Sequence, residues 1–311
     1  MREQQTAGVI AAISAYLLWG FLPLYWKFLS EVPSSEVLAQ RIIWSLLFMM
    51  AALFLMGRLK DVLQEVKGVF ASKQKTGAVI LASLFISTNW FIFIFAVNSD
   101  RVIEASLGYY INPLINVLLA AVFLKERLTM GEKSAFILAA AGVFLLTTQY
   151  EGFPWAALAL ALSFGCYGLI KKVVNLGAWA GLTIETLMVT PFALLFIFFF
   201  VEGEGFIRHY GSEQSLLLIG AGAVTAIPLL LFAAGARRIS FSLVGFLQYL
   251  APTIMLGLGV FLFQEPFSGL QLASFIIIWI GLFIFTISRS AVFRKEKRKK
   301  RDIQRETKMS G

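Results

Sequence analysis

Two charged residues stand inside otherwise apolar stretches of this sequence. Arg41 lies in "LAQRIIW" and Glu185 lies in "GLTIETL". A charge in a hydrocarbon environment is costly, so such residues tend to face ligands, partner side chains or water-filled paths. We interpret Arg41 as a group that holds an anion, and Glu185 as one that holds a cation or a coupling proton. The alternative is that each side chain extends to its nearest interface.

Prolines, amides and aromatic rings suggest a wider binding site. Because proline lacks an N–H, Pro113 frees the carbonyl of Tyr109, and Pro252 frees that of Gln248. A freed carbonyl in a membrane needs a neighbour, water or a ligand. With Arg41, the predicted substrate-binding residues are Tyr16, Trp19, Asn89, Trp90, Tyr109, Tyr110, Asn112, Gln248 and Tyr249. The alternative is that the amides tie helices together. Four tryptophans near helix ends are instead expected to anchor the helices at the interface: Trp26, Trp44, Trp155 and Trp279.

Common enzymatic and nucleic-acid-binding sites are not visible in the sequence. There is no G-x-x-x-x-G-K-[ST] phosphate loop, and a single His and a single Cys do not make the usual zinc site. We therefore expect no catalytic residue, no metal and no cofactor. The net charge is +9, but 10 of the 27 basic residues lie in the last 23 positions. Such a tail is typical of a membrane orientation signal rather than a nucleic-acid site.

The composition predicts a membrane protein that is all helical. Hydrophobic residues make up 59% of the chain and charged residues only 14%, against about 25% charged in soluble domains. Apolar blocks of about 20 residues have the length of a membrane-crossing helix. The ten blocks are Ala7–Leu29, Val37–Gly57, Thr76–Asn98, Glu104–Leu124, Met130–Gln149, Phe153–Lys171, Ala180–Val201, Ser215–Gly235, Phe241–Phe263 and Ser268–Ser288. Loops longer than ten residues are expected around 58–75 and 202–215.

The basic residues predict the orientation of these helices. If the N-terminus is cytoplasmic, 23 of the 27 Lys and Arg residues fall in cytoplasmic segments and three on the opposite side. This asymmetry follows the positive-inside rule, so both termini are predicted in the cytoplasm. Arg41 would then lie nearer the outer side and Glu185 nearer the cytoplasmic side. The two could pair only if both reach inward.

An internal repeat divides the predicted helices into two sets of five. A constant shift of 139 pairs Tyr110 with Tyr249, Pro113 with Pro252, Glu126 with Glu265, Gly142 with Gly281 and Thr147 with Thr286. The predicted repeats are residues 1–150 and 151–290, followed by a basic cytoplasmic tail at 291–311. Because five is odd, the repeats have opposite orientations. Secondary transporters often use this plan, with a substrate site near the midplane between the halves.

Several strings resemble a known family. In both halves a proline is followed 13 residues later by a glutamate, Pro113 by Glu126 and Pro252 by Glu265. This pattern resembles the paired EamA modules of the drug/metabolite transporter superfamily. The strings "GVIAAISAYLLWGFLPLYWK", "EVLAQR" and "NSDRVIEASLGYYINPL" are similar to the RarD family within it. The second half departs from the pattern, with "GFLQYLAP" in place of "GYYINP" and no arginine opposite Arg41.

The resemblance implies a ten-helix bundle with a central substrate cavity in the bacterial cytoplasmic (inner) membrane. We expect a secondary transporter, an exporter of a small metabolite such as an amino acid or a related amphipathic solute, that works by alternating access. Its expected partners are that solute, the lipid bilayer and a coupling proton, without nucleic acid. The alternative is a membrane protein that does not transport, such as a receptor, an assembly factor or a lipid-processing enzyme.

Overall fold

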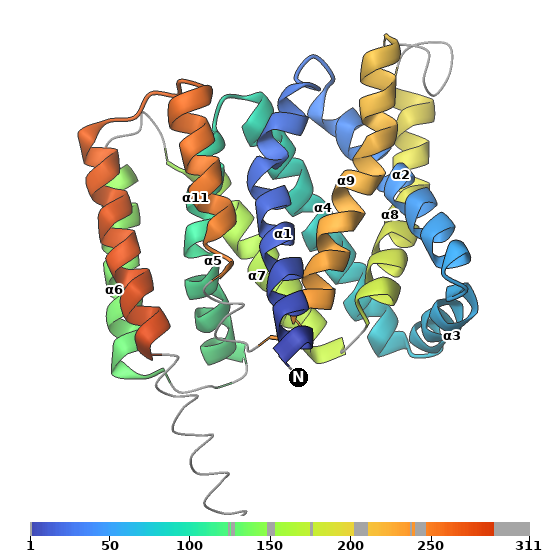
Figure 1. Cartoon of the computed structure of the whole chain (residues 1–311), viewed down its shortest axis with the longest axis horizontal. Helices are drawn as coiled ribbons and strands as arrows, with labels where there is room; N and C mark the ends of the chain where they lie inside the picture. Colours follow the sequence, from blue (N-terminus) through green and yellow to red (C-terminus); the bar gives the residue numbers. More distant parts are fainter. Residues whose placement is uncertain are drawn as a thin grey trace, which may run out of the picture.

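The chain folds into a bundle of upright helices (Figure 1). The computed structural model describes residues 2–123, 125, 128–147, 153–174, 177–201, 211–236, 238–239 and 247–288. Within these ranges all regular secondary structure is helical, as the composition predicts. The bundle contains α1 (Arg2–Lys27), α2 (Ser34–Leu55), α4 (Lys73–Asn98), α5 (Val102–Phe123), α6 (Met130–Thr147), α7 (Trp155–Val174), α8 (Ala178–Phe200), α9 (Ser212–Ala236), α11 (Leu250–Gly257) with its π-helical extension η1 (Leu258–Leu262), and a last helix, Gly269–Ser288.

Helix length and surface character identify a multi-pass membrane protein. Among the described residues, seven helices are long and apolar enough to cross a membrane, and the segments Trp155–Lys171 and Leu250–Leu262 are shorter apolar helices. Large apolar side chains also cover the outside, including Phe144, Phe192 and Phe198, each at least 70% exposed. Such an apolar surface fits lipid rather than water. Each predicted block contains a described helix, although residues 241–246 of the ninth lie outside the described ranges.

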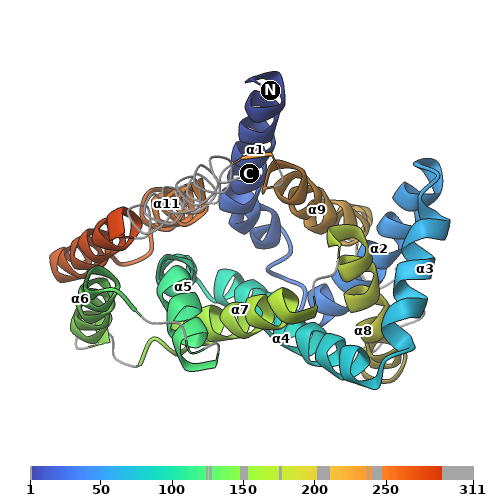
Figure 2. The same cartoon turned by 90° about the horizontal axis from the view of Figure 1, so that it is seen from below.

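Helices from the two predicted repeats pack against one another. Helix α1 contacts α9 and α11, whereas α7 contacts α4 and α5. In Figure 2, α1 lies between α9 and α11 on one side of the bundle, and α7 lies between α4 and α5 on the other. If α1 corresponds to α7, α4 to α9 and α5 to α11, the two arrangements are equivalent. Each predicted repeat therefore buries its helices largely against the other.

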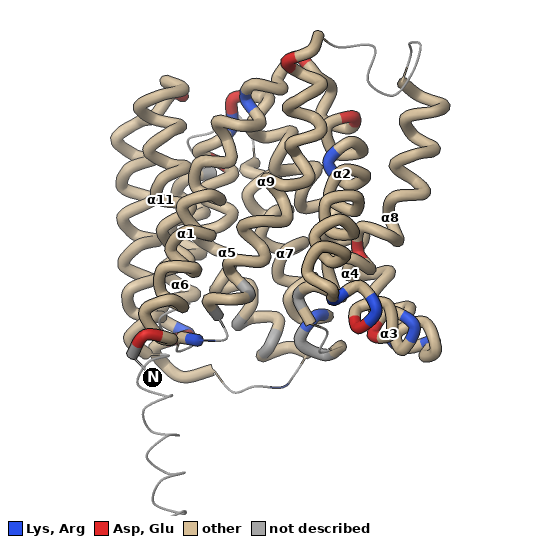
Figure 3. The backbone as a smooth tube through the Cα atoms, turned by 45° about the vertical axis from the view of Figure 1, so that its right-hand side comes forward, with Lys and Arg blue, Asp and Glu red and all other residues tan. Residues whose placement is uncertain are grey.

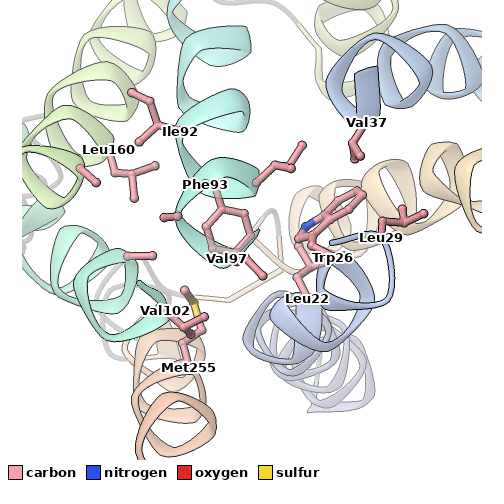
Figure 4. Packing of buried hydrophobic residues seen from close by; sticks show 14 of the residues in the cluster. Leu22, Trp26, Leu29, Val37, Ile92, Phe93, Val97, Val102, Leu160 and Met255 are labelled. Carbon is pink, nitrogen blue, oxygen red and sulfur yellow. The ribbon is translucent and has the colours of Figure 1, made fainter. Parts of the chain in front are cut away.

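A buried apolar cluster joins seven of these helices, including α9 through Leu218 and Ala221, near one end of the bundle. Figure 4 shows side chains converging from α1, α2, α4, α5, α7 and α11. Among its members Trp26, Leu29 and Val37 are fully buried. This cluster packs beside the N-terminal half of α2, which carries Arg41.

Helix α6 and the last helix pair through two equivalent glycines. A Cβ added at Gly142 would lie 2.7 Å from Cγ1 of Ile278 and 3.0 Å from the carbonyl oxygen of Ser274. A Cβ added at Gly281 would lie 3.0 Å from the carbonyl oxygen of Ala135. The shift of 139 that relates the glycines also relates Ala135 to Ser274. Glycine allows the two backbones to approach closely at both places.

Helix α3 (Leu59–Phe70) was not predicted. It lies at the lower end of the bundle in Figure 1, and the view from below in Figure 2 shows that it runs across this end. Its buried residues Val62, Val66 and Val69 follow helical spacing and pack against α8 and α4. The segment was expected to be a loop because its 12 residues are too few to cross a membrane. The i, i+4, i+7 spacing of the valines was the missed signal.

Basic residues collect at the end of the bundle that carries the N-terminus. Figure 3 shows most Lys and Arg positions at this lower end, beside α3 and the start of α4. At the opposite end the described basic residues are Lys27 and Arg101, each in an ion pair with an acidic residue. The distribution follows the asymmetry found in the sequence.

Candidate functional site

Arg41 is buried on α2 between two tryptophans. Its guanidinium carbon lies 4.4 Å from the ring centroid of Trp90 on α4 and 5.0 Å from that of Trp26 on α1. The side chain is only 4% exposed, and Tyr109 of α5 lies near it. A desolvated cation–π contact contributes about 2 kcal/mol. Trp26 is therefore buried against the cation, and its expected role as an interface anchor is wrong.

Two nitrogens of the guanidinium have no hydrogen-bond acceptor in the part of the chain that the structure describes. Nε and Nη1 of Arg41 are buried and have no hydrogen-bond partner among the described residues. Arg41 also takes part in none of the ion pairs of the described chain. Nε1 of the adjacent Trp26 is likewise buried without a partner in this part of the chain. A buried charge is costly unless it is paired and hydrogen-bonded. These three donors therefore suit an anion that approaches the guanidinium in its plane, from the edge.

Glu185 has partners on α7 and does not pair with Arg41. Lys171 Nζ lies 2.7 Å from Oε1 of Glu185, and the hydroxyl of Tyr167 donates to Oε2 at 3.0 Å. The carboxylate is almost fully buried, at 3% exposure of its side chain. Lys171 passes directly over Gly181, where a Cβ would collide with its ammonium group. The reasoning from sequence missed Tyr167 and Lys171, although their i, i+4 spacing on α7 places them on one face.

The aromatic residues predicted on α1 lie in one contact group with a residue that was not predicted. The rings of Tyr16 and Trp19 are 5.5 Å apart, and Phe232 of α9 lies 5.9 Å from Tyr16 and 5.6 Å from Trp19. Trp26 is seven residues beyond Trp19, which places both on the same face of α1. This face therefore presents a row of rings that ends at Arg41.

Tyr109 and Tyr110 point to different parts of the molecule. The ring of Tyr109 meets that of Phe93 at 5.7 Å, on the side of Arg41. The hydroxyl of Tyr110 is 2.7 Å from that of Thr253, and its ring stacks on Tyr249 at 6.4 Å. The predicted binding residues therefore fall into two groups. One lies around Arg41, and the other lies between α5, α11 and the last helix.

The predicted amides have different environments. Nδ2 of Asn89 donates to the carbonyl of Leu160 at 2.9 Å and to Oγ of Ser163 at 3.0 Å, which ties α4 to α7. Oδ1 of Asn112 is buried without a partner in the described ranges. Gln248 is half-buried in the turn that precedes α11. Asn89 has the structural role that we considered as the alternative, whereas a ligand role for the other two stays a prediction.

Two buried glutamates cap helix N-termini at the end opposite α3. Oε1 of Glu265 accepts from the N–H of Val102 at 2.7 Å, and Oε2 accepts from that of Ile103 at 2.9 Å. Glu104 accepts from the N–H of Ala156 at 2.8 Å and also pairs with Arg101. A carboxylate at a helix N-terminus satisfies free N–H groups and favours the helix dipole. Glu265, the second glutamate of the repeated Pro…Glu pattern, thus joins the two predicted repeats.

The described residues contain no group of three His, Cys, Asp or Glu that could hold a metal ion.

Comparison with known proteins gives the family. Residues 6–148 and 153–287 each match the EamA-like transporter family. The chain belongs to this family. It is 46% identical to the uncharacterized transporter YojE of Bacillus subtilis, over 91% of this chain and 94% of that protein.

The RarD resemblance is confirmed by further relatives. The protein RarD of Escherichia coli is 37% identical over 92% of this chain and 95% of its own length. A protein of Pseudomonas aeruginosa called chloramphenicol-sensitive protein RarD is 27% identical over 94% of this chain and 97% of its own length. A solved crystal structure with 24% identity and a TM-score of 0.59 covers 90% of this chain and 96% of that one, and it shows a similar fold. The protein is thus a membrane transporter of the EamA/RarD type, a group named for transport rather than for enzymatic activity.

Proposed function

We propose that this transporter is a secondary exporter of a small amphipathic carboxylate, such as an amino acid, across the bacterial inner membrane. The observation that carries the proposal is the buried Arg41 guanidinium, which has aromatic rings on its faces and unpartnered N–H groups at its edge. The planar fork of arginine matches the two oxygens of a carboxylate. The rings of Trp90 and Tyr109 provide an apolar environment for the rest of the solute.

We further propose ten transmembrane helices in two inverted repeats, residues 1–150 and 151–290, with both termini and the 291–311 tail in the cytoplasm. The equivalent packing of α1 and α7 supports this arrangement, as do the matching contacts of Gly142 and Gly281. Lys125 and Gln264, also related by the shift of 139, both adopt left-handed backbone conformations, with φ of 55° and 54°. Such an arrangement permits alternating access by rocking of one repeat against the other.

Glu185 is the residue that we propose for proton coupling. Its carboxylate is buried and shares its environment with Lys171 and Tyr167. Protonation of Glu185 would remove the charge that holds the Lys171 ammonium in place. A change of this kind can bias a two-state equilibrium of the helices around it.

The test is efflux from proteoliposomes that contain the purified full-length chain and are loaded with the standard amino acids, measured by mass spectrometry. We expect efflux of at least one amino acid that Arg41→Ala abolishes and Arg41→Lys restores only in part, because lysine keeps the charge but loses the planar fork. Lys133→Ala, at an exposed cation, is the matched control and should retain efflux. If the wild type releases nothing beyond empty liposomes, the proposed substrate class is wrong. If Arg41→Ala is fully active, Arg41 has a structural role.

A further inference from the structure

Helix α3 lies flat across one end of the bundle, where the other helices end (Figures 1 and 2). Since those helices cross the membrane, a helix lying across their ends runs along the membrane surface. Its length of 12 residues and its mixed composition, with four charged side chains, also fit a surface position. This location follows from the fold and does not depend on which solute is transported.

The side chains of α3 fall into successive sectors around the helix. Neighbouring residues are about 100° apart in an α-helix. Val62, Val66 and Val69 form the sector buried against the bundle. The next sector holds Leu63 and Phe70, which are apolar but 39% and 46% exposed.

The sector beyond the exposed apolar one is basic. It holds Lys60 and Lys67, which are seven residues apart and both exposed. The acidic residues of α3 lie on the remaining side: Asp61 is exposed, and Glu65 accepts a hydrogen bond from the backbone N–H of Gly177 at 3.0 Å. The order around the helix is therefore protein-facing, apolar, basic and acidic.

We propose that α3 is an interfacial helix that binds anionic phospholipid headgroups through Lys60 and Lys67. In this position Leu63 and Phe70 enter the acyl region beside the bundle, and the two lysines reach the phosphate level next to them. Further exposed basic residues at this end are Arg58, Lys73 and Lys75. Amphipathic helices with basic residues beside an apolar face bind membrane surfaces, and anionic lipids strengthen the association.

The protein-facing side of α3 contacts α8, the helix that carries Glu185. The buried valines of α3 share an apolar cluster with Ala180 and Ile184 of α8. Ile184 directly precedes Glu185, and Gly177, which is bonded to Glu65, is the N-cap of α8. Because α3 is bound to the start of α8, a headgroup that binds α3 also affects the position of α8.

The first experiment measures the depth of α3. In a Cys166→Ser background, Leu63→Cys and Gln64→Cys are reconstituted separately in vesicles of phosphatidylcholine and phosphatidylglycerol at a ratio of 3:1. A membrane-impermeant maleimide is applied to vesicles that expose this side. We expect Gln64→Cys to react and Leu63→Cys to be protected, although both positions are exposed in the protein itself. Equal labelling of the two would overturn the interfacial position.

The second experiment measures lipid preference. The purified full-length chain in detergent is supplemented with phosphatidylglycerol or phosphatidylcholine, and its thermal unfolding midpoint is recorded. Phosphatidylglycerol should raise the unfolding midpoint more than phosphatidylcholine does. The double variant Lys60→Gln/Lys67→Gln should remove this difference, because each basic residue strengthens association with anionic lipid about fivefold. The matched control Lys125→Gln/Lys133→Gln removes two other exposed cations and should keep the difference. A preference that survives in the α3 variant, or is absent from the wild type, contradicts headgroup binding at this site.

Discussion

Removal of the Glu265 carboxylate is expected to destabilise the protein strongly. Its two oxygens accept from the N–H groups of Val102 and Ile103, at 2.7 and 2.9 Å. The first N–H groups of a helix have no partner within the helix. Val102 and Ile103 are almost completely buried, so water does not easily replace the lost acceptor. The substitution Glu265→Ala leaves both N–H groups without a partner.

The size of the effect follows from these contacts. A hydrogen bond to a charged group contributes about 1.5–3 kcal/mol. Loss of both bonds in Glu265→Ala should therefore lower the free energy of unfolding by about 3–6 kcal/mol. Glu265→Gln keeps one carbonyl oxygen as an acceptor, so it should cost about half as much. The order of stability is thus wild type, then Gln, then Ala.

The assay is unfolding of the purified full-length chain in mixtures of a mild detergent and SDS, followed by tryptophan fluorescence. Glu213→Gln serves as the control, because Glu213 is an exposed acid in the first turn of α9. A surface change of this kind should stay within about 0.5 kcal/mol of the wild type. The reasoning is refuted if Glu265→Ala also stays within that range, or if Glu265→Gln is as destabilising as Glu265→Ala.

Three further predictions concern coupling, packing and topology. Glu185→Gln should remove the stimulation of efflux by a proton gradient while leaving downhill efflux measurable; a variant that is still stimulated contradicts coupling at this residue. Gly142→Ala and Gly281→Ala should each cost about 1–3 kcal/mol in SDS unfolding through overpacking. Their costs should add, because the two contacts are separate along the helix pair. Reporter fusions after Gly177 should report a cytoplasmic location and fusions within 202–212 an external one, and the reverse result would invert the proposed orientation.

The sequence predicted the helices well where length was the signal. A run of about 20 apolar residues has few alternatives to a membrane-crossing helix, and each such run contains a helix in the structure. Helix α3 gave no such signal, because its apolar residues form a stripe rather than a run. Its three buried valines could have been found by helical periodicity.

The candidate site was harder to predict because its contacts are distant in the sequence. Arg41 could be identified from the sequence because a charged residue in an apolar membrane segment is energetically costly. Its stacking partners Trp26 and Trp90 come from two other helices, and no spacing within α2 specifies them. The different directions of Tyr109 and Tyr110 were predictable, since consecutive helical residues point about 100° apart.

The contact between α6 and the last helix has the form of a homodimer interface within one chain. Gly142 meets the backbone at Ser274, and Gly281 meets the backbone at Ala135, the equivalent residue. In such an isologous contact each side presents the same surface to the other. A half-length chain with this surface could pair with a second copy of itself in the opposite orientation. If two such copies were fused into one chain, the glycine of each copy would still pack against the helix of the other copy. Both glycines would therefore be kept.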